Sequence, residues 1–548
     1  MADSLTNEQE YGFGGKQIYG DQRYDYVSWY EERYRAPIRL EIKYGEDGFP
    51  TEDCITSAFK KVIDKQKRYL WLRNIYQGLY QVWQRNWESV TGIKGVKVMA
   101  NTARQLTLDA ADFFLGNPIS YSLINFNGKD TKKDDEKLKK LNEIFTRQQL
   151  GEHDLSLAIA ASWAGVAYEY TYYEVDKNAD GTYKLDGKGL PTTPQKTIDM
   201  SPLNAAVVYH NDITRTPAFG MYFIEEEGKT FDERKYQYKL NVYTDKICRH
   251  FVISKEGGGL KKADPLAWRE TDAKGIPLAD ESVYVGRVPI AELENNSDRK
   301  ADWEDIVSLF DVQNDILCDR VNDIEMHIDS ILLLINKGTS FASYNNEELQ
   351  ALVQGLKAFK TLSLREGEDG KFLSNPLDQT GMQLCLDYND KLIHKLSRIP
   401  DFSDPAMSSL TGRALKVRLR PLISLCNGKA SNFRKFLADN RLKIYGQALG
   451  IDPATIKMDF TYGIPSDDLE TAQTVTPLVA GGIISKETAA TRLSFIDNGK
   501  DEQEKVKSQN AEEPQMPVDK FKDVDTSEKI DGQEVKGQLA TDNLNDEQ

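Results

Sequence analysis

Four aspartates recur at four-residue steps between residues 302 and 329, and they are the most distinctive cluster of chemically active side chains in the sequence. They are Asp311, Asp315, Asp319 and Asp323. Residues four apart lie on one face of an α-helix, so a helix here would carry a stripe of negative charge. Such a stripe can repel a polyanion or pair with bases of a neighbouring subunit. The simpler alternative is a solvated helix face.

A basic segment follows about ninety residues later, since residues 405–438 hold seven bases and no acid. The bases are Arg413, Lys416, Arg418, Arg420, Lys429, Arg434 and Lys435. They could contact phosphates, or they could pair with acidic helices inside one fold, and the sequence leaves both readings open. Pro421 interrupts the helical pattern of this segment and predicts a kink.

Signals of catalysis or of cofactor binding are missing from the sequence. There is no G-x-x-x-x-G-K-[ST] phosphate loop, and the five histidines stand in no metal-ligand spacing. Residues 176–181 imitate the start of a calcium-binding loop, but position twelve is Gly187 instead of glutamate, which favours a hairpin turn. Cys248 and His250 alternate along one predicted strand and indicate a shared sheet face. We therefore predict no catalytic, metal-binding or cofactor-binding residue.

Composition narrows the class of protein further. The 548 residues contain 70 bases and 86 acids, a net charge of -16. This balance argues against a protein that binds duplex DNA by neutralising its phosphates. The five cysteines are sparse and odd in number, which indicates reduced thiols. The polar start and the short aliphatic runs predict neither a signal peptide nor membrane association.

The periodicity of apolar residues predicts helices, then strands, then helices again. Residues 59–116 and 154–164 have the helical period, and residues beyond 295 return to it. The strands are expected at 168–175, 207–209, 220–224, 236–243, 250–254 and 282–287. The 302–329 helix has an apolar seam of Trp303, Ile306, Phe310, Leu317, Val321, Ile324 and Ile328, with its gap at Gln313 and Asn314.

Five short motifs, in this order along the chain, resemble those of portal proteins of siphophage-type tailed bacteriophages. They are residues 113–118, 165–170, 288–298, 399–416 and 482–488. The resemblance implies an α+β portal architecture with long stem and tunnel helices, a β-rich wing, a small α/β clip and a helical crown. Its clip would hold a strand at 330–335, a helix at 346–360 and a strand at 361–365.

Composition predicts an irregular N-terminal arm at residues 1–60 and a disordered acidic tail at residues 500–548. Between them, the resemblance implies that residues 61–295 are the wing, 296–329 and 381–400 the two stem helices, 330–380 the clip, 401–450 the tunnel loop and tunnel helix, and 451–499 a strand and helical crown.

A portal role implies a homo-oligomeric ring of twelve copies, or thirteen when recombinant, with double-stranded DNA passing through its channel. The implied partners are the terminase motor, a head-completion or connector protein, and the major capsid and scaffolding proteins. The implied location is the portal vertex of the virion, after assembly in the host cytoplasm. The expected DNA-facing residues of the tunnel loop are Ser403, Asp404, Ser408, Ser409, Thr411, Arg413 and Lys416, and the four aspartates would line the acidic stem.

Two other classes of protein fit the sequence. One is a non-portal structural or scaffold protein of a viral particle, which would form no closed ring. The other is a nucleic-acid-processing enzyme without recognisable motifs, which would need a metal-dependent activity or nucleotide binding.

Overall fold

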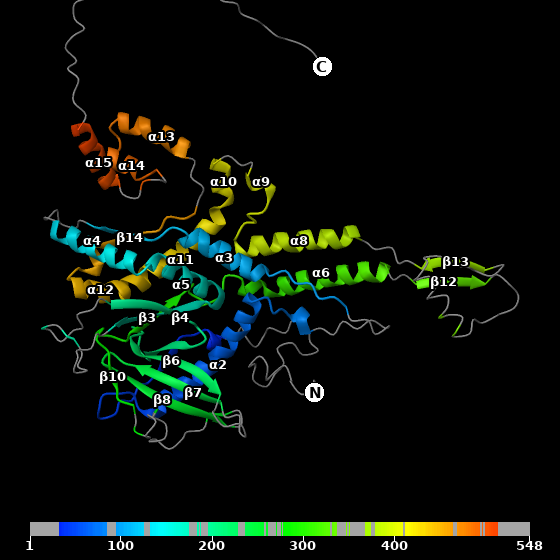
Figure 1. Ribbon diagram of the computed structural model, residues 1–548, viewed down its shortest axis with the longest axis horizontal. Coiled ribbons are helices and arrows are strands. Elements are labelled where there is room, and N and C mark those ends of the chain that lie inside the picture. Colours follow the sequence, from blue (N-terminus) through cyan, green and yellow to red (C-terminus); the bar gives the residue numbers. More distant parts are fainter. Residues whose placement is uncertain are drawn as a thin grey trace, which may run out of the picture. The chain divides into compact units, whose positions relative to one another are not determined.

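The structure is a computed structural model, and it divides into two compact units, Met1–Ile464 and Pro465–Gln548. It describes residues 32–84, 95–124, 132–174, 184–185, 187, 195–227, 236–256, 259–260, 270, 276, 278–328, 331–336, 347, 350, 368–373, 379–408, 412–463, 468–493, 496 and 499–512. Helices and strands occupy largely separate stretches of the chain, which confirms the predicted α+β class (Figure 1). Within the described stretches, no helix is both long and apolar enough to cross a membrane.

A seven-stranded sheet forms the β-rich part of the first unit. Its strands are β1 (Ile38–Leu40), β5 (Ala205–His210), β6 (Pro217–Glu227), β7 (Tyr236–Tyr243), β8 (Ile247–Glu256), β9 (Gly259–Leu260) and β10 (Glu281–Ser282). The order is β1-β5-β6-β7-β8-β10, with β9 beside β8. All neighbours are antiparallel except β1 and β5. The first half of α2 (Glu52–Tyr76) packs on this sheet, where Phe59 meets the rings of Phe223 and Tyr238 edge to face.

The predicted irregular arm is wrong for its last third. Residues 38–40 form β1, and α2 begins at Glu52, because Ile38, Ile55 and Phe59 bury apolar surface against the sheet. The predicted strand at 282–287 is also wrong beyond Ser282, where the chain turns through Gly286 at a φ of 69°. Residues 1–31 lie outside the described part of the chain.

A helical body lies beside the large sheet and contains the larger core. Its helices are η2 (Glu32–Tyr34), η3 (Gln81–Gln84), α3 (Thr102–Leu115), α4 (Lys132–Arg147), α5 (Leu150–Ala164), α11 (Arg420–Asp439), α12 (Arg441–Leu449) and η5 (Pro453–Thr455). Two small sheets complete it: β11 (Ile290–Glu294), β3 (Val166–Tyr173) and β4 (Gln195–Met200) in the order β11-β3-β4, and β14 (Ile456–Asp459) with β2 (Ser120–Leu123). Strands β4 and β11 were not predicted.

Two long helices pack antiparallel where stem helices were expected. They are α6 (Val307–Ile328), preceded by η4 (Glu304–Ile306), and α8 (Gln379–Ser397). Asn389 donates to the carbonyl of Leu309 at 3.0 Å, and Arg320 donates to Gln383 at 2.6 Å. Between these helices in sequence, β12 (Ile331–Asn336) pairs with β13 (Glu368–Leu373). The expected strand at 361–365 lies outside the described residues, as does nearly all of the expected helix at 346–360.

A short helix, α9 (Pro405–Ser408), lies where a flexible loop was expected over residues 401–412. Helix α10 (Gly412–Arg418) then begins the segment that was expected to be helical. The helix breaks at Leu419, and Pro421 stands in the first turn of α11, which confirms the predicted kink.

The second unit contains α13 (Asp468–Ala480), α14 (Lys486–Ala490) and α15 (Gly499–Glu512). The predicted disordered tail is therefore helical over its first residues, through Glu512. Residues 513–548 are outside the described chain.

A fully buried ion-pair network joins the helical body to the small sheet. Arg441 of α12 pairs with Glu169 of β3 and, at 2.6 Å, with Asp154 of α5. Burial opposes ionisation, yet the Arg441 guanidinium and a hydrogen bond from His153 hold the pKa of Glu169 at about 2. Buried charges are stable only when they are paired in this way.

Replacing Arg441 by methionine should therefore destabilise the protein by about 3–5 kcal/mol, because Glu169 and Asp154 would stay buried without their cation. Urea unfolding followed by circular dichroism measures the change. The matched control is Arg418→Met, which removes an exposed pair with Asp404 and should cost about 1 kcal/mol or less. Equal losses in the two variants would contradict the structural role of the buried network.

Candidate functional site

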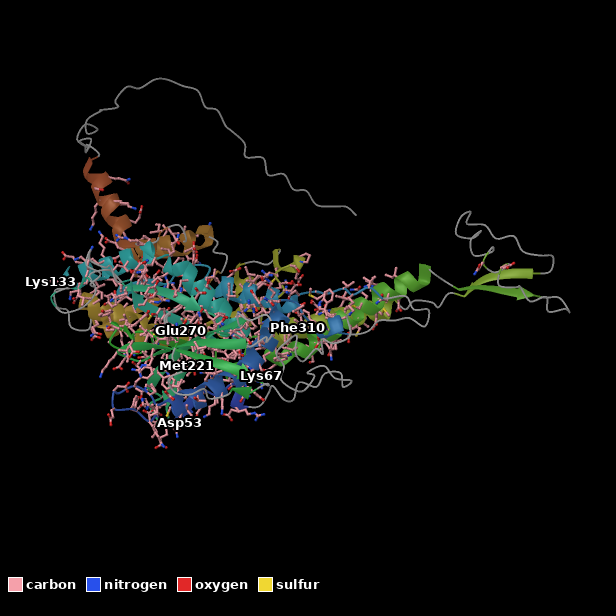
Figure 2. All side chains as sticks on the ribbon, turned by 60° about the horizontal axis from the view of Figure 1, so that its bottom comes forward. Asp53, Lys67, Lys133, Met221, Glu270 and Phe310 are labelled. Carbon is pink, nitrogen blue, oxygen red and sulfur yellow. The ribbon has the colours of Figure 1, made fainter. Side chains whose placement is uncertain are left out.

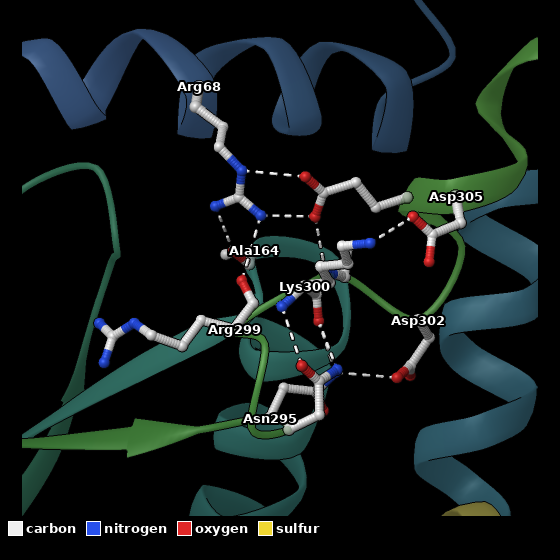
Figure 3. Close-up of polar contacts among 10 residues, drawn as sticks. Arg68, Ala164, Asn295, Arg299, Lys300, Asp302 and Asp305 are labelled. Carbon is white, nitrogen blue, oxygen red and sulfur yellow. Dashed lines mark hydrogen bonds and ion pairs between the residues drawn. The ribbon is translucent and has the colours of Figure 1, made fainter. Parts of the chain in front are cut away.

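The turn of residues 295–304 leads into the acidic stem helix, and buried side chains from other elements hold it (Figure 3). Arg68 of α2 makes two parallel hydrogen bonds to Glu304, Nε to Oε1 at 3.0 Å and Nη2 to Oε2 at 2.5 Å. The same guanidinium donates to the carbonyls of Ala164 and Arg299. Both charged groups of the Arg68–Glu304 pair are almost completely buried. This pair therefore fixes where the stem helix starts.

Asp302 makes a second anchor in the same turn. Its Oδ2 accepts from Ser162 and from Lys429 of α11, each at 2.5 Å, and its Oδ1 accepts from Asn295 at 2.9 Å. Lys429 belongs to the basic segment found in the sequence. Lys429 therefore pairs with an acid inside the fold. Arg434 instead donates to the carbonyl of Met458.

Gly165 lies directly beneath this turn and cannot be replaced without strain. Its φ is +83°, and a Cβ atom there would lie 2.2 Å from the carbonyl oxygen of Arg299. Glycine alone tolerates both the left-handed conformation and such a close approach.

Side chains of α6 also form hydrogen bonds to the backbone of an extended segment, residues 95–100. Asn314 accepts from the N–H of Ala100 at 2.6 Å and donates to its carbonyl at 3.5 Å. Asn322 likewise accepts from the N–H of Val96 at 2.7 Å and donates to its carbonyl at 3.1 Å. Between them, the thiol of Cys318 accepts from the N–H of Val98 and donates to its carbonyl, both at 3.1 Å. We call these three side chains the Asn–Cys–Asn ladder.

The spacing of the ladder has a simple geometric basis. Two residues of extended chain advance about 6.6–6.8 Å, and four residues of helix advance about 6.0 Å. Every second residue of the segment therefore meets every fourth residue of α6. Sequence reasoning missed the ladder and treated Asn314 as a gap in the apolar seam. The four-residue recurrence of Asn314, Cys318 and Asn322 was the available signal.

The predicted seam of α6 is correct at its start and wrong toward its end. Trp303, Ile306 and Phe310 are buried, and Phe310 marks this end of α6 in Figure 2. Ile324 is 40% exposed, and the side-chain position of Ile328 is not described. Asn314 and Cys318 of the ladder are buried instead, and Asn322 is half-buried.

The four aspartates of α6 do not share one environment. Asp319 is exposed, and Asp315 and Asp323 are half-buried. Asp311 is buried, and its Oδ1 accepts from the backbone N–H of Gln81 at 3.3 Å. Burial raises the pKa of Asp311 to about 7; the Gln81 hydrogen bond lowers this pKa, and the nearby Asp315 carboxylate raises it to a smaller extent. The reading of Asp311 as part of a solvated stripe is therefore wrong.

The segment between α8 and α10 is ordered by its own aspartates. Asp401 accepts from the N–H and the hydroxyl of Ser403, at 2.8 and 2.6 Å. Asp404 accepts from the N–H of Ala406, which caps α9, and it pairs with Arg418. These contacts, the Ala406 N–H first and then Arg418, lower the pKa of Asp404.

The remaining predicted loop residues are only partly described. Lys416 is exposed on α10. Ser408 ends α9 and Arg413 lies in the first turn of α10, but the positions of their side chains are outside the description. Ser409 and Thr411 fall outside the described residues altogether. The structure thus brings Asp404 to Arg418 and leaves the channel-facing assignments as predictions.

Cys248 and His250 lie near Glu281, with ligand atoms within 4.8 Å of one another. Burial, together with the Glu281 carboxylate, raises the pKa of Cys248 to about 12. A thiol with this pKa is protonated at neutral pH and is a poor nucleophile. The predicted calcium-like loop at 176–181 lies outside the described residues.

Comparison with known proteins gives one family. Residues 59–516 match the family described as phage portal protein, SPP1 Gp6-like. The portal protein of Bacillus phage SPP1 is 22% identical over 318 residues, which are 55% of this chain and 59% of that protein. The chain thus spans less than two thirds of this relative.

Two solved structures show low similarity. A chain from the neck of a native gene transfer agent particle has 11% identity and a TM-score of 0.36, over 72% of this chain and 88% of its own length. An HK97 family phage portal protein from Corynebacterium diphtheriae has 9% identity and a TM-score of 0.28, over 68% of this chain and 99% of its own length.

The buried Asp311 predicts a specific dependence of stability on pH. Its folded pKa of about 7 lies above the unfolded value of about 3.9, so the folded protein binds more protons between these values. The contribution of Asp311 to the free energy of unfolding is therefore fully present below about pH 4 and is lost as the pH rises through 7. We expect the unfolding free energy of Asp311→Asn minus that of wild type to be about 2–4 kcal/mol larger at pH 8 than at pH 4. Thermal unfolding across this range measures it.

The control for this prediction is Asp319→Asn, which changes an exposed aspartate two turns away on the same helix. It should leave the pH profile of wild type unchanged. Parallel profiles for wild type and Asp311→Asn would show that Asp311 is ionised in the folded protein.

Proposed function

Because this chain belongs to the SPP1 Gp6-like family of phage portal proteins, we propose that copies of it form a ring-shaped channel at one vertex of a capsid. Viral DNA is packaged and later ejected through this channel. The observation that carries the proposal is the family match over residues 59–516, which extends from α2 to α15. The role is structural, in keeping with the family, and needs no catalytic residue.

The described elements fit a division of labour within each subunit. We assign α6 and α8 to the stem, the β12–β13 pair to the clip, and the large sheet with its helices to the wing. Helices α10 and α11 are the tunnel helix, broken at Leu419. Helices α13 and α14 belong to the crown, and α15 extends it into the segment expected as the tail.

Neighbouring subunits of the ring would cover an apolar stripe on α8. Leu384, Tyr388 and Leu396 lie at four- and eight-residue steps and are 70%, 64% and 57% exposed. Large apolar side chains at this spacing form one helix face that the single chain leaves in water. Lys391 and Lys395 are exposed beside it. The stripe and its flanking lysines therefore form the face that we assign to the contact with the next copy.

The channel surface follows from the same arrangement. An acidic wall from Asp319 and its neighbours repels phosphate and keeps DNA from adhering to a passage that it must traverse. The loop after α8 gives brief contacts through Ser403, Ser408, Ser409 and Thr411, with Arg413 and Lys416 behind it. Asp404 and Arg418 hold the base of this loop.

The partners follow from the proposed place of the ring. The terminase motor and a head-completion or connector protein would dock on it, and major capsid and scaffolding proteins would surround it in the virion. The ring would assemble in the host cytoplasm.

The first test is the mass of the purified protein. Light scattering after size exclusion should give about twelve times the chain mass of 62.1 kDa, or thirteen times for a recombinant ring. Leu384→Glu should shift this mass toward the monomer, because it places a charge in the apolar contact. The matched control, Ile213→Glu, changes a fully exposed isoleucine outside the stem and should leave the ring intact.

Two outcomes of this experiment would contradict the proposal. A wild-type monomer at all concentrations would refute the ring, and the non-portal scaffold protein would then be favoured. A normal ring in Leu384→Glu would refute α8 as the contact surface.

The loop gives a second test. Replacing Ser408 and Ser409 by tryptophan should leave ring mass and stability unchanged, because neither serine belongs to the apolar pattern of the segment. DNA packaging, measured as nuclease-protected genome per particle, should fall. Normal packaging in this variant would place the loop away from the channel.

A further inference from the structure

The end of α8 and the residues after it bring together a histidine and two carboxylates that the portal role does not use. Asp390 and His394 lie one turn apart on α8, and Asp401 follows in the loop. One ligand atom of each lies within 4.8 Å of the others. The left-handed turn at Arg398, with a φ of 64°, folds the chain back so that Asp401 returns to the helix.

The hydrogen bonding of His394 determines which of its ring nitrogens is available. Nδ1 lies 2.9 Å from the carbonyl oxygen of Ile399. A carbonyl can only accept, so Nδ1 carries a proton and donates it. Nε2 then faces the carboxylates, with Asp390 Oδ1 at 3.8 Å. A backbone carbonyl that orients the far nitrogen is a typical outer-shell contact of metal-binding histidines.

The charge of the cluster is not neutralised by other side chains. Asp109 of α3 interacts electrostatically with both His394 and Asp401, which adds a third carboxylate. Among the described residues, no lysine or arginine forms an ion pair with Asp109, Asp390 or Asp401. Asp401 accepts hydrogen bonds from Ser403. Within the part of the chain that the structure describes, the cluster thus offers several oxygen ligands and one nitrogen ligand without a lysine or arginine partner.

We propose that His394, Asp390 and Asp401 form a site for a divalent metal ion of the zinc class. Imidazole nitrogen with carboxylate oxygen suits Zn²⁺, whereas Mg²⁺ and Ca²⁺ prefer oxygen alone. Zinc bonds of about 2.0–2.1 Å place tetrahedral ligand atoms about 3.3 Å apart. Small side-chain rotations close the present separations to that value. Water or Asp109 completes the coordination.

The bound ion would hold Asp401, the fourth residue after α8, against the last turns of that helix. If the loop faces the channel, as the proposed function has it, the ion sets the angle at which the loop leaves the stem. This consequence rests on the proposed function, but binding of the ion does not.

Zinc binding to the full-length, tag-free protein tests the site. After metal removal with EDTA and dialysis, isothermal titration with ZnCl₂ should show one saturable site per subunit. His394→Gln and Asp390→Asn should each weaken this binding by about 10–100-fold. The matched control is Asp387→Asn, an exposed aspartate one turn earlier on α8, which should bind zinc like wild type.

Two results would overturn the site. Wild type that binds no zinc refutes it directly. Zinc binding that His394→Gln and Asp390→Asn leave unchanged shows that the ion sits elsewhere. Light scattering on the same samples reports the ring separately, so loss of zinc binding and loss of assembly are distinguished.

Discussion

The arrangement of the first unit depends on two buried cations that meet two acids in one short turn. Arg68 comes from α2 and Lys429 from α11, and they pair with Glu304 and Asp302 just before the stem helix. A buried charge without its partner costs several kcal/mol. Both ion pairs can form in only one arrangement of α2, α11 and the turn. This arrangement determines the position of α6. The Asn–Cys–Asn ladder and the contacts between α6 and α8 can form only after α6 has been placed.

Part of this fold was predictable because local patterns match local structure. The strand predicted at 236–243 has the same bounds as β7, since its alternating apolar residues face a single core. The break before α11 was predictable from Pro421, which lacks an N–H and disrupts a continuing helix. The apolar seam predicted for residues 302–329 is also correct at Trp303, Ile306 and Phe310, and it is wrong at Ile324.

The rest depends on contacts between distant parts of the chain, which a local pattern does not contain. Asp311 and Asp319 have the same side chain and lie on the same helix, yet Gln81 and residues 95–100 cover only one part of it. Lys429 and Lys416 are equally basic in the sequence, but one lies beside Asp302 and the other faces water. Strand β11 was missed because it pairs with β3, more than a hundred positions away.

The Asn–Cys–Asn ladder also has a mechanical meaning. Two hydrogen bonds at each of Asn314, Cys318 and Asn322 join residues 95–100 to α6. These bonds run across the gap between the helix and the segment beside it. A force along α6 loads these rungs in shear and must strain all of them together. A force perpendicular to the helix loads the terminal rung first and peels the segment away one rung at a time. The attachment is therefore stiff along the helix axis and weak across it. Tension along this axis is shared between α6 and residues 95–100.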